Sequence, residues 1–429
     1  MIGRRVVITG VGVITALGIG AESNWFSVVK GESGISYITS FNPSSFQTQI
    51  AAEVKNFEPE EYISDKKIIN MLRKGDDYGL VATKMAMDDA RLEHGSIDST
   101  KGGIYIGCGK EIVSLEYMFP AVEASINKDG HVDQRKLAVE AIKQTYPLLL
   151  VKDLPNSVLF YISKLYQFQG INSNIVIGGT ASSQAIGGAF RAIQYGDSNF
   201  AIAGGFDSPV NPINVSLFSN LGLLSTRNNE PNEACAPFDM TRDGFVLGEG
   251  AGIVILEELN HALSRGARIY AELVGYAATC DLAEIMNQKP EGKSLAIAIC
   301  KALKDANITP DQVDYINAHG DATPLGDRSE TLAIKKALNG AAYQIPISST
   351  KPITGHLLAA SGAVELIFTI MAIKRGEVPP TINYKYPDPL CDLDYVPNQS
   401  RETEINVALV VNCGVEGRNA VLVCRKFTG

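Results

Sequence analysis

The chain has 429 residues, of which 45% are apolar and 20% are charged, and its net charge at pH 7 is −9. This composition is typical of a globular protein with a sizeable core, and the lack of any stretch rich in Lys or Arg argues against a nucleic-acid partner. No apolar run approaches the ~20 residues that a membrane-spanning helix needs, so we expect a cytoplasmic protein without membrane association.

Short apolar runs rich in β-branched residues recur along the chain and predict strands that are buried on both faces. In chain order they are residues 6–9, 104–106, 175–177, 201–203, 253–256, 271–274, 315–317, 345–348, 407–411 and 421–424. Segments with helical character lie between them, at residues 78–90, 183–195, 294–306 and 329–337. Strands that alternate with helices predict an α/β fold.

A coarse internal repeat divides the chain. Residues 175–196 and 345–376 each run from a predicted strand through a turn of small residues into a helix. We therefore expect two similar halves, 1–256 and 257–429, packed as a duplicated five-layer α-β-α-β-α sandwich. Residues 111–154 are mixed in charge and helix-prone, have no counterpart in the second half, and are interpreted as an insertion in the first.

The cysteines indicate reduced thiols rather than a disulfide frame or a metal site. They are odd in number and scattered, and none forms a Cys-x-x-Cys pair, which is the usual signature of a zinc or redox site. The seven are Cys108, Cys235, Cys280, Cys300, Cys391, Cys413 and Cys424. We expect no metal in this protein.

Two of the five histidines stand out by their position. His319 and His356 each follow a predicted buried strand and adjoin Gly, which is where an imidazole can point into a pocket at a strand end. The alternative is a pair of core histidines bonded to the backbone. The remaining three, His94, His131 and His261, are interpreted as surface residues.

The motifs around these histidines resemble those of the β-ketoacyl-carrier-protein synthase family, of the ketosynthase II type. They are His-Gly-x-x-Thr-Pro at 319–324, Ser-Thr-Lys-x-x-x-Gly-His at 349–356, a helix carrying Glu365, and the stretches 203–205, 224–227 and 237–252. The resemblance runs from about residue 3 to residue 425. It implies a thiolase fold, a dimer, no bound cofactor, and substrates carried on the phosphopantetheine arm of an acyl carrier protein.

The nucleophilic cysteine of that family is missing. Matching the segment 174–197 to the family places Gly179 at the cysteine position, and a slip of one residue would offer Gly178 or Thr180. No cysteine lies between Cys108 and Cys235, so the nucleophile is absent in any register. Glycine cannot be acylated, and therefore transfer of an acyl group onto the enzyme has no acceptor.

Other nucleophiles near this position are poor substitutes. The hydroxyls of Thr180, Ser182 and Ser183 lie close by in sequence, but an unactivated hydroxyl does not replace a thiolate. Cys413 lies in the loop that closes the family's active site, and a buried structural thiol is the favoured interpretation.

The resemblance implies roles for the residues that remain. His319 and His356 match the histidines whose N–H groups stabilise an enolate oxygen, and Lys351 and Glu365 match the supporting pair that fixes the local field. A second oxyanion site would use the backbone N–H of Gly179 at a helix N-terminus, together with an N–H of the C-terminal glycine-rich loop.

Two segments depart from the family pattern. The gate loop has Val415 where the family has an aromatic residue and Glu416 where it has a glycine, which opens the gate and adds charge. The residues after His-Gly that hold the pantetheine arm are Asp321, Ala322 and Thr323, so that only Thr323 keeps a hydroxyl. The arm is therefore expected to bind at Asp321 and Thr323 in an altered way.

Decarboxylation of a malonyl thioester needs no nucleophile, and it is the function that this pattern predicts. The chain would convert malonyl-carrier protein to acetyl-carrier protein in polyketide or fatty-acid-like biosynthesis, as a homodimer. Two alternatives remain. One is a non-catalytic chain-length-factor-type subunit that forms a heterodimer with an active ketosynthase, and the other is a condensing synthase whose cysteine at position 179 has been substituted.

Overall fold

The computed structural model describes residues 3–92, 98–109, 115–281 and 290–429. Five strands of the first half form one set: β1 (Val6–Thr15), β5 (Gly102–Cys108), β6 (Asn172–Val176), β7 (Phe200–Asp207) and β8 (Gly250–Glu258). Their order across the sheet is β6-β5-β7-β8-β1. β5 is parallel to β6 and β7, whereas β8 is antiparallel to β7 and β1.

The second half repeats this arrangement. Its strands are β9 (Ala271–Cys280), β10 (Tyr315–Asn317), β11 (Ile347–Ser348), β14 (Val407–Cys413) and β15 (Arg418–Arg425), in the order β11-β10-β14-β15-β9. Each pairing has the same direction as its counterpart in the first half. The same order with the same directions in both halves shows a duplicated unit. The two sets meet where Val6–Ile8 of β1 pair antiparallel with Ala271–Leu273 of β9.

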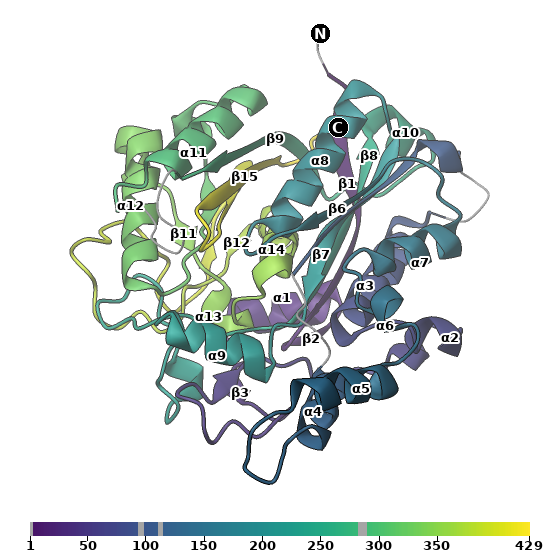
Figure 1. Cartoon of the computed structure of the whole chain (residues 1–429). Coiled ribbons are helices and arrows are strands. Elements are labelled where there is room, and N and C mark those ends of the chain that lie inside the picture. The colour runs from purple at the N-terminus through teal and green to yellow at the C-terminus, as the bar shows by residue number, and fades with distance from the viewer. Residues whose placement is uncertain (1–2, 93–97, 110–114, 282–289) are drawn as a thin grey trace.

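The helices form three layers around these strands (Figure 1). α3 (Lys74–Ala90) and α7 (Ser157–Tyr166) cover the outside of the first set, and α11 (Lys293–Ala306) and α12 (Pro324–Leu338) cover the outside of the second. α8 (Ala181–Tyr195) and α14 (Ser361–Arg375) lie between the two sets and contact each other. The predicted five-layer α-β-α-β-α sandwich is therefore confirmed.

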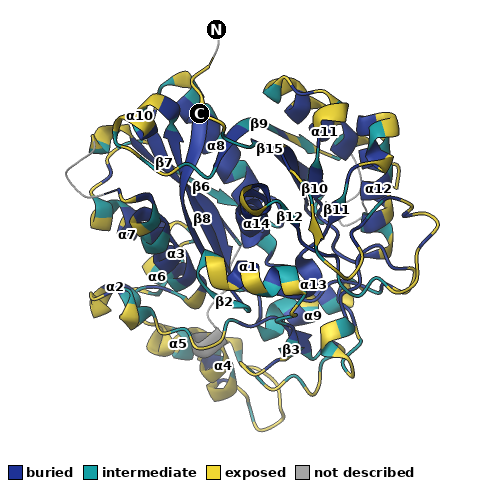
Figure 2. Ribbon diagram, turned by 180° about the vertical axis from the view of Figure 1, so that it is seen from behind, coloured by how far each residue is buried: buried dark blue, intermediate teal, exposed yellow. Residues whose placement is uncertain are grey.

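The central layer explains why α14 is apolar on all sides. Its residues from Ser361 to Ile373 are all buried, as the dark ribbon in Figure 2 shows. A helix enclosed by two sheets has no solvent face on which to place polar groups. Glu365 is the only acidic residue of this buried stretch, so its charge needs a partner inside the protein.

The remaining elements are short or peripheral. They are α1 (Ala21–Lys30), α2 (Lys66–Ile69), α9 (Pro212–Asn220), α10 (Leu259–Ser264), α13 (Lys351–Thr354), β2 (Gly18–Ile19), β3 (Ser36–Tyr37), β4 (Ile50–Ala51), β12 (Glu377–Val378) and β13 (Arg401–Glu402). In the described parts of the chain, no helix is both long and apolar enough to span a membrane.

The segment predicted as an insertion forms three helices at one end of the molecule: α4 (Leu115–Ala124), α5 (Gln134–Gln144) and α6 (Leu149–Lys152). Residues 111–114 of that prediction lie outside the described residues. Apolar side chains are exposed here and on the adjoining α7, and they include Phe119, Val139, Ile142 and Phe160. β6 forms the edge of the sheet on the same half. This part of the surface is thus unusually apolar for one that faces water.

Candidate active site

The residues singled out by the sequence come from separate elements that end near one another. Gly179 lies between β6 and the N-terminus of α8, His319 follows β10, and His356 follows α13. The rings of His319 and His356 are edge to face, with centroids 5.2 Å apart. A Cβ built on Gly179 would lie 3.5 Å from the His356 ring atom Cε1. The structure therefore brings the two histidines and the vacant nucleophile position together.

The tautomer of His356 follows from its backbone neighbour. The amide of Leu358 donates to the His356 Nδ1 atom at 3.3 Å, and an amide can only donate. Nδ1 is therefore the acceptor and Nε2 carries the proton. Ser361 Oγ lies 3.0 Å from the same Nδ1 and helps to hold the ring.

The charge state of His356 is set by its surroundings. Burial lowers the pKa of His356 well below its usual value, and the positive charges of Lys351 and His319 lower it further, against the opposing effect of Asp321. A neutral imidazole with its proton on Nε2 is a hydrogen-bond donor that keeps this role at neutral pH. His356 is therefore prepared to donate to an oxygen atom in the site.

His319 is held by its main chain rather than by its ring. The amides of His319 and Gly320 donate to the two carboxylate oxygens of Glu330, at 2.7 and 2.8 Å. The His319 carbonyl accepts from Lys351 Nζ. The ring atom Nδ1 is buried and has no hydrogen-bond partner among the described residues, and Nε2 lies 3.6 Å from Asp321 Oδ2, too far for a hydrogen bond. The imidazole is thus placed but left with unused hydrogen-bonding capacity.

Lys351 and Glu365 form a buried ion pair, with 2.6 Å between Nζ and Oε1. The pair continues into a chain of hydrogen bonds, because Asn412 donates to the other oxygen of Glu365 and Ser183 donates to Asn412. This chain links β14 and the first turn of α8 to the loop that carries His319. The sequence singled out Ser183 only as a poor substitute nucleophile, and it gave no signal for the role of Asn412.

The two residues expected to hold the pantetheine arm bond to each other. Thr323 Oγ1 donates to Asp321 Oδ1 at 2.7 Å and accepts from the Gly326 amide at 3.1 Å, so that it caps the N-terminus of α12. Burial would raise the pKa of Asp321, but the nearby His319 ring with its charge, together with the bonds from Thr323, holds that pKa below its usual range. Binding of the arm at these residues stays a prediction.

Gly179 is required by the backbone that faces it. A Cβ at this position would lie 2.6 Å from the carbonyl oxygen of Cys413, closer than such atoms approach in proteins. Among the described residues, the amides of Gly179 and Val415 also have no hydrogen-bond partner. A backbone donor at Gly179, close to His356, and a second in the gate loop fit the predicted second oxyanion site.

We expect Gly179→Ala to destabilise the protein by about 1–3 kcal/mol, because the loop at Cys413 must move to admit the methyl group. Gly340→Ala is the matched control, since a Cβ at Gly340 meets nothing within 4 Å. The measurement is the midpoint of chemical unfolding for both variants. Equal midpoints would show that the loop at Cys413 can move without a loss of stability.

The gate loop brings the side chain of Glu416 toward the vacant nucleophile position. It forms a tight turn closed by bonds from the Gly414 amide to the Arg418 carbonyl and from the Gly417 amide to the Gly414 carbonyl. The Glu416 side chain folds back, so that a Cβ on Gly178 would lie 3.1 Å from Glu416 Oε2. The sequence indicated only that this position carries a new charge, not that the charge lies beside the vacant nucleophile position.

Cys413 is no substitute nucleophile. The residue is buried, and burial raises the pKa of its thiol well above the usual value, with further contributions from the negative charges of Glu330 and Asp321. A protonated thiol attacks carbonyl groups poorly. The interpretation of Cys413 as a structural thiol is consistent with this environment.

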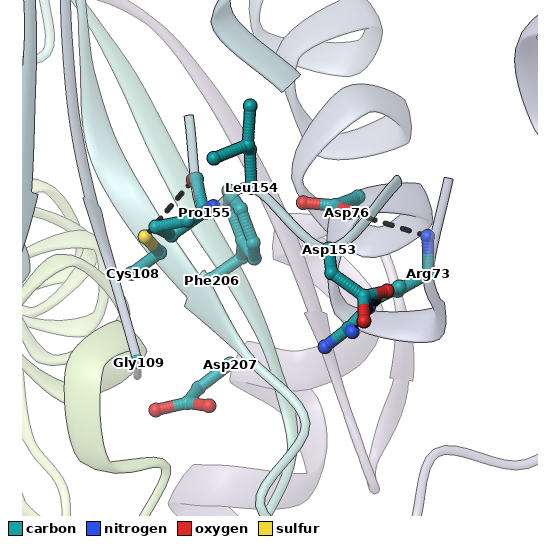
Figure 3. A pocket seen from close by; sticks show the side chains of 9 residues that line it. All are labelled: Arg73, Asp76, Cys108, Gly109, Asp153, Leu154, Pro155, Phe206 and Asp207. Carbon is teal, nitrogen blue, oxygen red and sulfur yellow. Dashed lines mark hydrogen bonds and ion pairs between the residues drawn. The ribbon is translucent and has the colours of Figure 1, made fainter. Parts of the chain in front are cut away.

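One small pocket lies beside the histidines and another lies in the first half of the fold. The first, with a cavity volume of only about 10 Å³, lies beside His319 and is lined by Asp281, Gly292, Leu295, His319, Gly326, Ser329, Glu330, Cys413 and Asn419. The other lies at the N-terminal end of α3 (Figure 3). There the Arg73–Asp153 ion pair links the end of α6 to the start of α3, and the Asp207 carboxylate lies below Phe206 in the view. Within the described part of the chain, no group of three or more His, Cys, Asp or Glu side chains is placed to hold a metal ion.

Sequence comparison matches both halves of the chain to one family. Residues 3–262 match the N-terminal domain of β-ketoacyl synthases, and residues 270–385 match the C-terminal domain. The chain is 40% identical to the 3-oxoacyl-[acyl-carrier-protein] synthase 2 of Synechocystis sp., over 99% of this chain and 98% of the relative. It is 38% identical to the protein of the same name from Coxiella burnetii, over 98% of each.

Solved structures give the same result for the fold. One is a chain of the AntDE:AntF complex, described as a type II polyketide synthase acyl carrier protein in complex with its ketosynthase. This chain superposes on it with a TM-score of 0.85 and 34% sequence identity, and the match covers 99% of this chain and 100% of that one. The ishigamide ketosynthase/chain length factor matches with a TM-score of 0.88 and 30% sequence identity, over the same shares of the two chains. A β-ketoacyl synthase from Burkholderia phymatum matches with a TM-score of 0.87 and 30% sequence identity, over 99% of this chain and 100% of that one.

Proposed function

Because this chain belongs to the β-ketoacyl synthase family, and so has the thiolase fold of that family, we propose that it is an enzyme that decarboxylates malonyl-carrier protein to acetyl-carrier protein without an acyl-enzyme intermediate. The observation that carries the proposal is the pairing of His356, neutral and protonated on Nε2, with a glycine at the nucleophile position. The group that stabilises an enolate is kept, and the group that accepts an acyl chain is not.

The reaction would proceed in two steps. The bond between Cα and the malonyl carboxyl group breaks, carbon dioxide leaves, and the electron pair spreads onto the thioester oxygen. The N–H groups of His356 and His319 stabilise that charge, with Lys351 and Glu365 fixing the loop that carries His319. A proton then adds to Cα and gives the acetyl group.

The partner in this proposal is an acyl carrier protein, whose phosphopantetheine arm brings the malonyl group to the two histidines. The structure of AntDE with AntF is described as a ketosynthase in complex with its carrier protein, which supports such a partner for this chain. We propose that two copies pair through the apolar surface of α4–α7 and the edge strand β6.

The proposal is tested by incubating malonyl-loaded and hexanoyl-loaded carrier proteins separately with the chain and recording intact masses. The expected result is loss of carbon dioxide from the malonyl carrier and no acyl adduct on the chain with either substrate. An acyl adduct on the chain would contradict the absence of an acyl-enzyme intermediate.

The pH dependence of the reaction should reflect the state of His356. Its pKa is held well below the usual value by burial and then by the charges of Lys351 and His319, so the neutral donor persists below pH 6.5. We expect an even rate from pH 8 to pH 6, with the loss confined to lower pH. Replacing Lys351 by Met removes one of these positive charges and should move the acid limb to higher pH. The measurement is the initial rate of decarboxylation as a function of pH, for the wild type and for Lys351→Met.

One observation favours a second candidate, a chain-length-factor-type subunit. The exposed apolar side chains of α5 and α7 could seat an active ketosynthase as well as a second copy, and one structural relative is described as a ketosynthase/chain length factor. Such a subunit would have no activity alone and would co-purify with a cysteine-bearing relative. Keeping both histidines with the Lys351–Glu365 pair favours the decarboxylase.

A condensing synthase with a substituted cysteine is the weakest candidate. The Cys413 carbonyl leaves no room for a Cβ at position 179, and Glu416 lies where the family has a glycine. Restoring the cysteine alone, in Gly179→Cys, should therefore not produce a condensing enzyme.

A further inference from the structure

The Glu416 carboxylate packs against two glycines, Gly414 and Gly178. A Cβ on Gly414 would lie 2.5 Å from Glu416 Oε1 and 2.7 Å from Oε2, and a Cβ on Gly178 would lie 3.1 Å from Oε2. Any side chain at Gly414 would thus expel the carboxylate. The Gly178 contact places it one residue from Gly179, the position that faces His356.

One oxygen of this carboxylate is left without a partner. Glu416 is half-buried, yet its Oε1 atom is buried and makes no hydrogen bond within the described part of the chain. Burying a polar oxygen without a partner costs free energy. An oxygen kept in that state beside a reaction site is available to a substrate.

The other acidic side chains beside the histidines are engaged. Glu330 accepts two backbone amides, Glu365 pairs with Lys351, and Asp321 accepts from Thr323. The Cys413 thiol is buried with its carbonyl turned toward Gly179. Glu416 differs from these carboxylates in having a buried oxygen that makes no hydrogen bond within the described part of the chain.

We infer that Glu416 is the acid that protonates the enolate carbon, an inference that rests on the proposed decarboxylation. After carbon dioxide leaves, the electron pair of the enolate forms a new C–H bond at Cα with the proton of the Glu416 carboxyl group. The O–H bond breaks and leaves Glu416 as a carboxylate, and a proton from water restores the acid. The step therefore requires Glu416 in its acid form and the malonyl group as a carboxylate.

The same group must work in reverse, which gives a test independent of carbon dioxide release. A Glu416 carboxylate should remove a methyl proton from acetyl-carrier protein, with the enolate held by the histidines, and should return a deuteron in deuterated buffer. Deuterium uptake into the acetyl group is read by mass spectrometry. We expect uptake with wild type and a decrease of roughly 10²-fold or more in Glu416→Gln, which has the same shape but no exchangeable carboxyl proton.

Controls separate this result from a change in folding. Glu404→Gln removes the same charge from a side chain that is 74% exposed and should exchange like wild type. Glu416→Gly should lose exchange as Glu416→Gln does, because it also lacks the carboxyl group. Both Glu416 variants should still lose carbon dioxide from malonyl-carrier protein, at a rate reduced less than tenfold, because water can protonate the released enolate.

Two results of the exchange experiment would overturn the inference while leaving the proposed function in place: exchange that is unchanged in Glu416→Gln, or decarboxylation by a wild-type chain that performs no exchange. A wild-type chain that neither decarboxylates nor exchanges would remove the proposed function and the role of Glu416 together. Loss of decarboxylation in both Glu416 variants, with unfolding midpoints like wild type, would also contradict proton donation after carbon dioxide loss.

Discussion

His356→Ala should slow the conversion of malonyl-carrier to acetyl-carrier protein by roughly 10²–10³-fold, the usual cost of removing one donor to a developing oxyanion. The Nε2–H of His356 is fixed as a donor because Nδ1 accepts from the Leu358 amide, and the ring lies 3.5 Å from a Cβ position at Gly179. The effect should fall on the turnover rate rather than on carrier binding, since the charge exists only during the reaction. Steady-state rates at several carrier concentrations separate the two.

Two further variants sharpen this result. The amide nitrogen of His356→Gln can reach the position of Nε2, so this variant should keep more activity than His356→Ala. His131→Ala, at an exposed position in the loop before α5, should have no effect. If His356→Ala and His131→Ala decarboxylate equally well, the enolate is not stabilised by His356 and the proposed site is wrong.

Lys351→Met should destabilise the protein by about 3–5 kcal/mol, the cost of leaving one member of a buried ion pair alone. Glu365 would keep its bond from Asn412 but lose the cation at 2.6 Å, in the middle of a helix that is buried on all sides. The His319 carbonyl would lose its Lys351 donor as well, so activity should fall together with stability. The midpoints of thermal and urea unfolding report the stability.

The double variant Lys351→Met/Glu365→Leu distinguishes a buried charge from lost packing. Removing both charges should recover much of the stability, because the desolvation cost of Glu365 disappears with its partner. Activity should not recover, since His319 remains without its support. Lys304→Met, on the exposed face of α11, is the control for loss of one lysine. A Lys351→Met protein as stable as this control would show that the pair contributes nothing to stability.

Much of the fold could be predicted because strand runs and helix patterns alternate regularly. The short β-branched runs at 104–106 and 407–411 became β5 and β14, and the repeated strand-turn-helix units became the two central helices. The helix expected at 329–337 begins five residues earlier, at Pro324, because Thr323 caps it through the Gly326 amide. Caps of this kind depend on a side chain whose sequence signal was assigned to substrate binding.

The site could be predicted only where a motif carried it. His319, Lys351 and His356 belong to short motifs, and their approach to one another follows from the order of the strands. The position of the Glu416 carboxylate could not be predicted, since it depends on glycines at 178 and 414 that lie far apart in the chain. The bond that links Ser183 and Asn412 joins two halves of the fold, and sequence separation hides such pairs.

The most direct test of the central claim is the intact mass of malonyl-loaded carrier protein after incubation with a catalytic amount of this chain alone. Many turnovers to acetyl-carrier protein, with no other enzyme present and strongly reduced turnover in His356→Ala, are the result we predict. A carrier that keeps its malonyl group, while the same chain supports synthesis only when a cysteine-bearing ketosynthase is added, would contradict the claim and identify a non-catalytic subunit instead.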